Sequence, residues 1–281
     1  MAVYLGTAGY TNRDWLGRFY APGTRPAAWL GVYAAHFRAV ELNSTFYGLP
    51  RPATLARMVT QTAGRVRFAL KLPQSFTHRR DAGPSEFVAL RQAVQPLRDT
   101  ETLGSLVAQF PFSFGHNPSH WAYITQLIEA MALDGVVVEF RHGSWHRPAV
   151  RDKLRALGVG WVSPDYPNLP GLPPAGLHIL GDVAYLRLHG RNQATWWTGQ
   201  DQAERHDYSY TAAELAPWVT ALANAAGHWR DAWVIFCNTT RGQALDNLTT
   251  FRGLMRPAGL VEAEDGVPHQ TVPLAIQGEL F

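Results

Sequence analysis

Eight short apolar or β-branched runs, separated by segments of helical periodicity, constrain the fold of this chain more than any other feature. The runs lie at 3–5, 39–42, 66–70, 105–110, 136–140, 158–162, 184–188 and 233–236. They are continuously apolar, as in parallel strands covered on both faces, and between them apolar residues recur every three or four positions, as in helices. Strict alternation of eight strands with helices favours a single-domain α/β fold, a TIM-type (β/α)8 barrel, over an open doubly wound sheet.

Two segments depart from this alternation. Residues 166–174 read Tyr-Pro-Asn-Leu-Pro-Gly-Leu-Pro-Pro, and this density of proline and glycine predicts an irregular loop after the sixth strand instead of a helix. Residues 258–281 lack helical periodicity. We therefore expect a barrel domain over residues 1–257 and a flexible C-terminal tail over residues 258–281.

Composition excludes several classes of protein. Apolar residues make up 46% of the chain and charged residues 17%, which suits a packed globular domain. Cys237 is the only cysteine, so neither an intrachain disulfide nor a thiolate metal cluster can form. No run approaches the ~20 apolar residues that span a bilayer, and no basic segment precedes an apolar one at the N-terminus. These features predict a cytoplasmic protein without a membrane partner.

Polar side chains stand at the C-terminal end of every predicted strand, where barrels of this kind build their active sites. Glu139 and Arg141, like Arg187 and His189, are two residues apart and therefore share one face of a strand. The candidate catalytic residues are Glu41, Glu139, His142 and His189, and the candidate ligand-binding residues are Asn43, Tyr47, Lys71, His78, Gln109, Arg141, Asp165, Arg187, Arg191 and Asn238.

The charged residues of this set could instead serve only to hold the fold together as buried ion pairs. Glu41 would then pair with Lys71, and Glu139 with Arg187. Burying unpaired ions costs several kcal/mol each, so a set of this size must be internally paired or serve a ligand. Formal net charge is only +3, which makes bulk attraction to nucleic acid weak. Because cations outnumber carboxylates within the set, we expect it to bind an anion, most simply a phosphate or carboxylate.

The sequence leaves the cofactor unknown. A divalent metal could bind among the three carboxylates and two histidines of the set, but no His-Glu-x-x-His spacing supports one.

Trp196 and Trp197 could stack on a base or sugar, or could form a lid packed on the barrel rim. Cys237 has no neighbouring base and is interpreted as a buried structural thiol.

The motifs together resemble the domain-of-unknown-function 72 family. They are Gly6-Thr-Ala-Gly9-Tyr10, Phe19-Tyr20, Val40-Glu41-Leu-Asn43-Ser-Thr-Phe-Tyr47, Phe68-Ala-Leu-Lys71, Gln109-Phe-Pro111, Val138-Glu139-Phe-Arg141-His142-Gly-Ser-Trp145, Arg187-Leu-His-Gly-Arg191 and Phe236-Cys-Asn238. The resemblance implies a TIM barrel and brings no established reaction. It extends, at the level of fold, to sugar-phosphate isomerases and metal-dependent apurinic endonucleases, and fold does not determine function.

Three functions fit these residues. The first is a phosphoester hydrolase acting on nucleic acid or a nucleotide, in which Lys71, Arg141 and Arg187 hold the phosphate. Glu139 or Glu41 would then be the general base, and a histidine the general acid. The second is a sugar-phosphate isomerase or epimerase whose carboxylates move a proton beside a metal. The third is a non-catalytic module that binds a phosphorylated ligand.

The last five residues suggest a partner. Gln277, Leu280 and Phe281 resemble the short peptide by which bacterial DNA-processing proteins dock on the sliding clamp, with a glutamine, a spacer and an apolar Leu-Phe pair. The alternative is that Leu280 and Phe281 pack on the barrel itself.

Overall fold

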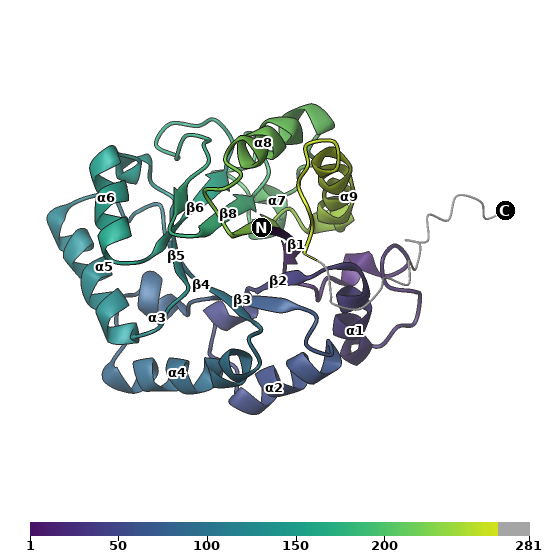
Figure 1. Cartoon of the computed structure of the whole chain (residues 1–281), viewed down its shortest axis with the longest axis horizontal. Coiled ribbons are helices and arrows are strands. Elements are labelled where there is room, and N and C mark those ends of the chain that lie inside the picture. The colour runs from purple at the N-terminus through teal and green to yellow at the C-terminus, as the bar shows by residue number, and fades with distance from the viewer. Residues whose placement is uncertain (264–281) are drawn as a thin grey trace.

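Eight parallel strands close into a barrel in the computed structural model, which describes residues 1–263 (Figure 1). The barrel strands are β1 (Ala2–Ala8), β2 (Ala39–Leu42), β3 (Arg67–Lys71), β4 (Leu103–Phe110), β5 (Val136–Phe140), β6 (Gly160–Asp165), β8 (Val183–Leu188) and β9 (Asp231–Phe236). Neighbours in the chain pair in parallel, β9 pairs with β1, and a pairing of β6 with β8 completes the closure. The predicted TIM-type barrel is confirmed.

The helices form a ring outside the strands (Figure 1). They are α1 (Pro26–His36), α2 (Pro52–Gln61), α3 (Gln74–Thr77), α4 (Pro84–Asp99), α5 (Pro118–Met131), α6 (Pro148–Ala156), α7 (Gln202–Arg205), α8 (Ala212–Asn224) and α9 (Gln243–Met255), with 3₁₀ turns η1 (Arg13–Trp15), η2 (Ser44–Phe46), η3 (Gly143–Trp145) and η4 (Thr240–Gly242). Proline opens α1, α2, α4, α5 and α6, where its missing N–H costs no hydrogen bond. Within residues 1–263, none of the helices combines the length and apolar character needed to cross a bilayer.

The segment after β6 has no helix, as predicted. Residues 166–178 are irregular, and the chain then forms β7 (Ile179–Leu180), which pairs antiparallel with β8. Gly181 makes the turn between β7 and β8 with a φ of 62°, a conformation that favours glycine. The sequence did not predict β7, because a two-residue strand is too short to show any periodicity.

The barrel interior changes from apolar to charged along the strands. Its apolar layers contain Ala39, Ala69, Val107, Val137, Val162, Tyr185, Trp233, Ile235 and Cys237. Side chains two residues apart share a face, so the inward position after Ala39, Ala69, Val137 and Tyr185 is occupied by Glu41, Lys71, Glu139 and Arg187. Four charges therefore converge at the C-terminal ends of the strands.

Residues 261–263, part of the segment expected to form a detached tail, lie beside β1. The N–H of Val3 donates to the carbonyl of Val261 at 2.9 Å, and Ala263 donates to the carbonyl of Val3 at 2.8 Å. β2 pairs with β1 only from Gly6 onward, so the first half of β1 has a free edge that this segment occupies. The barrel domain thus extends past residue 257, and Gln277, Leu280 and Phe281 lie outside the described residues.

Candidate functional site

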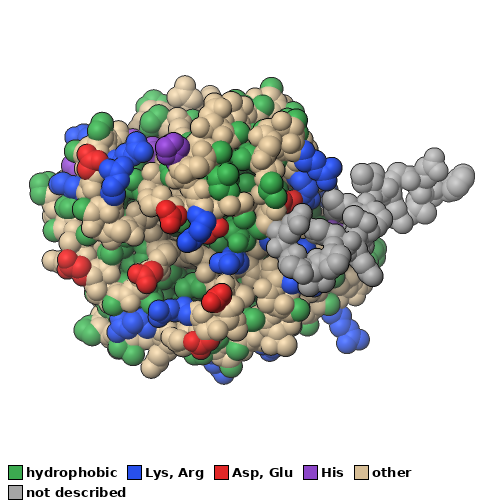
Figure 2. Space-filling view, in the orientation of Figure 1, with side chains coloured by type: hydrophobic (Ala, Val, Ile, Leu, Met, Phe, Trp, Pro, Cys, Tyr) green, Lys and Arg blue, Asp and Glu red, His purple; other side chains and the backbone are tan. Residues whose placement is uncertain are grey.

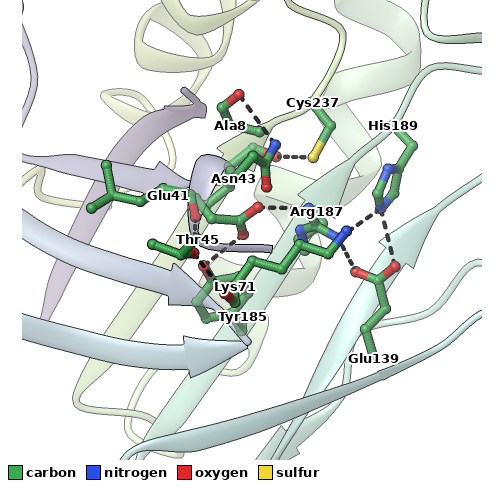
Figure 3. Close-up of polar contacts among 12 residues, drawn as sticks. Ala8, Glu41, Asn43, Thr45, Lys71, Glu139, Tyr185, Arg187, His189 and Cys237 are labelled. Carbon is green, nitrogen blue, oxygen red and sulfur yellow. Dashed lines mark hydrogen bonds and ion pairs between the residues drawn. The ribbon is translucent and has the colours of Figure 1, made fainter. Parts of the chain in front are cut away.

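Arg187 is the centre of the charged layer. Its side chain is 3% exposed, and it donates from Nη2 to Glu41 Oε1 at 2.6 Å and from Nη1 to Glu139 Oε2. Figure 3 shows the guanidinium between the two carboxylates. Tyr185 donates to the other oxygen of Glu41 at 3.1 Å, and Tyr166 donates to the other oxygen of Glu139 at 2.6 Å. All four carboxylate oxygens are therefore occupied.

These contacts make the glutamates poor candidates for a general base. Burial by itself would raise the pKa of Glu139, but the charged guanidinium of Arg187 outweighs it and holds that pKa well below its ordinary value. The predicted pairing of Glu139 with Arg187 is present, whereas Glu41 pairs with Arg187 and not with Lys71.

Lys71 is buried without a carboxylate partner. The side chain is 7% exposed, its Nζ lies 4.1 Å from the centre of the Phe46 ring, and no carboxylate in residues 1–263 comes within 4.0 Å of it. Burial, together with Arg141 and Arg187, lowers the pKa of Lys71 to about 7. A fraction of the amine is consequently unprotonated at neutral pH.

His189 and Arg141 flank Glu139. His189 is fully buried, and its Nε2 lies 3.5 Å from Glu139 Oε1 and 3.4 Å from Arg187 Nη1. Burial lowers the pKa of His189 to about 4, so its ring is neutral at pH 7. Its Nδ1 has no hydrogen-bond partner within the described part of the chain.

The Arg141 side chain is 21% exposed, and its Nε lies 3.6 Å from Glu139, beyond hydrogen-bonding distance.

A polar cavity of about 260 Å³ opens above this layer. Five predicted residues line it: Asn43, Lys71, Arg141, Arg187 and His189. Sequence reasoning missed eight further lining residues: Ala8, Asn12, Asp14, Ala203, His206, Cys237, Thr239 and Thr240. The inward phase of β9, which includes Ile235, carries Cys237 into the cavity, but burial raises the pKa of its thiol to about 12. The thiol stays protonated, in keeping with the structural role expected for it.

Three predicted ligand-binding residues face the helices instead of the cavity. Asp165 accepts two hydrogen bonds from Arg191, at 2.8 and 2.9 Å, and one from Tyr210 at 2.6 Å. Asn238 donates to Asn247 of α9 at 2.8 Å. Inward positions on β6 and β9 alternate with outward ones, and Asp165 and Asn238 fall in the outward phase of these strands. Arg191 follows β8 and pairs with Asp165. Their interactions fasten the helical layer to the barrel.

The other candidates lie around the site without lining the cavity. Tyr47 is 78% exposed, His78 packs edge-on against Phe46 with ring centres 4.7 Å apart, and His142 is 2.8 Å from the hydroxyl of Ser144. Gln109 points inward in register with Glu139, and its amide donates to the carbonyl of Phe110.

The aromatic loop after β8 has the lid arrangement at Trp196, and stacking on a base or sugar stays a prediction. Trp196 is buried, with its ring centre 5.2 Å from that of Tyr166, as in a lid packed on the rim. Trp197 is half exposed and packs edge-on against Phe112, with ring centres 4.8 Å apart. The residues proposed for a metal are not assembled: within residues 1–263, no three His, Cys, Asp or Glu side chains are grouped so as to hold one ion.

Fold and site together define a (β/α)8 barrel with a small cationic cavity at the C-terminal ends of its strands. A family model described as "Protein of unknown function DUF72" matches residues 4–271, and the chain belongs to this family. The UPF0759 protein YunF of Bacillus subtilis is 28% identical over 261 residues, covering 87% of this chain and 92% of that protein.

Two solved structures of DUF72 family proteins have the same fold. The protein from Thermotoga maritima is 33% identical, with a TM-score of 0.83 over 91% of this chain and 100% of that one. The protein from Enterococcus faecalis is 21% identical, with a TM-score of 0.80 over 95% of this chain and 99% of that one.

Proposed function

We propose that this protein is an enzyme that binds the phosphate group of a small compound at the mouth of the barrel and catalyses proton transfer on that compound. One observation carries the proposal. Arg141 and Lys71 line the same cavity, and neither is hydrogen-bonded to a carboxylate within the described residues. Both are therefore available to an anionic ligand, whereas the charge of Arg187 is already used.

Local clustering, rather than overall charge, supports an anionic ligand. Lys and Arg side chains are interspersed with Asp and Glu side chains on the face shown in Figure 2, in keeping with a formal net charge of +3. The cavity, by contrast, is lined by three cations, Lys71, Arg141 and Arg187, and by one carboxylate, Asp14. The two buried glutamates beside it already accept hydrogen bonds from Arg187 and tyrosines. Charge-assisted hydrogen bonds from Arg141 would hold the phosphate, and Lys71 would add to the attraction in the fraction of molecules in which its amine is protonated.

The roles of the cavity residues follow from their protonation. Arg141 binds the anion and stabilises charge that develops during the reaction. Lys71, whose pKa of about 7 suits a general base, accepts the proton, and neutral His189 can relay it. Phosphoester hydrolysis, with nucleotides or nucleic acid as substrates, is the first reaction to test. Isomerisation of a sugar phosphate, in which the base takes a proton from carbon and not from water, is the second.

Binding and turnover can be tested separately. Isothermal titration with inorganic phosphate should detect binding to the unmodified protein, and Arg141→Ala should weaken it by about 1–3 kcal/mol. A panel of phosphoesters, sugar phosphates and short nucleic acids, with and without added divalent ions, then identifies the reaction. If the protein binds phosphate but turns over none of the compounds, it is a phosphate-binding module and not an enzyme of this kind. If Arg141→Ala binds phosphate as tightly as the unmodified protein, the proposal is wrong.

A further inference from the structure

Lysine is rare in this chain, and one of its lysines lies in the cavity. Of 25 Lys and Arg residues, only Lys71 and Lys153 are lysines. Lys153 is an exposed residue of α6 over the ring of Trp121. Arginine binds phosphate through a planar fork of donors and keeps its proton, whereas a lysine can release its proton and become a nucleophile. The cavity thus carries guanidinium groups at two positions and an amine at the third.

The surroundings of Lys71 favour a neutral amine. A lysine whose only task is to bind an anion gains from carboxylates that keep it charged, and none lies within 4.0 Å of this one in residues 1–263. The Phe46 ring under Nζ and the more distant Glu139 and Glu41 favour the charged amine, but burial, together with the two guanidinium groups of the cavity, outweighs them and lowers the pKa of Lys71. Desolvation and neighbouring cations are the two means by which proteins prepare a nucleophilic lysine.

We propose that Lys71 is a nucleophilic residue that forms an imine with an aldehyde or ketone whose phosphate group is held by Arg141. This inference deepens the proposed function and rests on it for the binding of the phosphate. In it Lys71 attacks the carbonyl carbon in place of acting as the general base, and proton transfer is left to His189. It narrows the substrate class to small phosphorylated carbonyl compounds. The cavity volume of about 260 Å³ equals the share of about nine water molecules in the liquid, which suits a compound of that size.

The reaction needs no oxidant or reductant. The lone pair of the neutral amine forms an N–C bond with the carbonyl carbon, and the electrons of the C=O π bond move to oxygen, which takes up a proton. The second N–H proton and the resulting hydroxyl group then leave as water, and a C=N bond forms. His189, neutral and lining the same cavity, is placed to relay these protons. Protonated, the imine withdraws electrons from the adjacent carbon, where bonds then break more easily.

Borohydride trapping tests this chemistry on the full-length protein. The protein is incubated with dihydroxyacetone phosphate or glycolaldehyde phosphate, reduced with sodium borohydride, digested and examined by mass spectrometry. Hydride converts the imine into a stable secondary amine. The Lys71 peptide should then gain the mass of the carbonyl compound less one oxygen atom. Labelling of Lys71 should exceed that of Lys153 at least about tenfold, and should fall by a similar factor with unphosphorylated dihydroxyacetone.

The two lysines provide matched variants. Lys71→Arg keeps the positive charge and removes the nucleophile, so it should abolish the adduct. Lys153→Arg should leave it unchanged. A circular dichroism melt of each variant shows whether it folds. If Lys71→Arg does not fold, the position of the label on the unmodified protein still identifies the reactive lysine.

Each outcome bears on one of the two proposals. Phosphate binding by titration with no adduct at Lys71 from either phosphorylated compound would overturn the imine and leave the proposed function. An adduct at Lys71 that forms equally well without the phosphate group would support the imine and contradict anion binding. Equal labelling of Lys71, Lys153 and the N-terminal amine would show unselective reaction and overturn the inference.

Discussion

The two arginines of the cavity differ in how far their charge is already used. Arg187 is enclosed between two buried carboxylates, whereas Arg141 is partly exposed and beyond hydrogen-bonding distance of Glu139. Replacing Arg187 by Ala would leave Glu41 and Glu139 buried without their cation. We expect a loss of about 3–5 kcal/mol in the free energy of unfolding, measured by urea denaturation.

A surface ion pair gives the control for this variant. Arg155 and Asp152 are 3.0 Å apart, with side chains more than half exposed, so Arg155→Ala should cost less than about 1 kcal/mol. Equal losses from Arg187→Ala and Arg155→Ala would mean that the buried cluster does not depend on its cation.

Lys71 should make anion binding depend on pH. Its pKa is lowered to about 7, and a bound anion favours the charged amine and raises that pKa. Affinity is therefore highest below pH 7 and falls as the pH rises through and above that value. Sulfate is the suitable probe, because its own charge is constant over this range. Titration at pH 6 and pH 8 should show the decrease in the unmodified protein and a weaker one in Lys71→Arg; a flat profile would contradict the assignment.

Among the elements, Asp165 joins the end of β6 to α8. Besides Arg191 and Tyr210, it accepts a hydrogen bond from the indole of Trp218 in α8 at 3.2 Å, and it is fully buried. Asp165→Asn should therefore cost about 2–4 kcal/mol of unfolding free energy, and the affinity of the folded protein for phosphate should stay the same. Denaturation and titration of one preparation measure both. If Asp165→Asn lost affinity for phosphate but kept its free energy of unfolding, Asp165 would be a ligand-binding residue, as the sequence predicted.

For the whole molecule, buried neutral histidines should make stability sensitive to acid. Burial lowers the pKa of His189 and His178 to about 4 and that of His146 to about 3. Between about pH 6.5 and pH 4 the unfolded chain binds protons that the folded chain does not. The contribution of these histidines to the free energy of unfolding is therefore fully present above about pH 6.5 and is lost as the pH falls toward 4. For His189 alone, such a shift corresponds to about 3 kcal/mol.

Urea denaturation at pH 7 and pH 5 measures this dependence. His146 and His178 lie together, with facing ring nitrogens 3.3 Å apart, and neither lines the cavity at the barrel mouth. Replacing both by Asn should therefore reduce the loss at pH 5 without changing phosphate binding. Stability that is equal at the two pH values would show that these histidines titrate normally.

The sequence by itself determined the barrel and the composition of its charged end. Eight continuously apolar runs alternating with helical patterns specify parallel strands covered on both faces, and the two-residue spacing of Glu139 with Arg141 and of Arg187 with His189 places each pair on one face. These are local properties, because they depend only on residues close together in the chain.

The tertiary structure decided which face is inside and which charges meet. A strand buried on both sides is apolar on both, so its pattern does not show that Cys237 points into the cavity and Asp165 toward the helices. Barrel closure places Arg187 of β8 against Glu41 of β2, two strands that are not neighbours in the sheet. With the Arg187–Glu139 pair, that contact joins both glutamates to one guanidinium, and within residues 1–263 no carboxylate pairs with Lys71. The partners of a buried charge are neighbours distant in sequence, which a local pattern does not show.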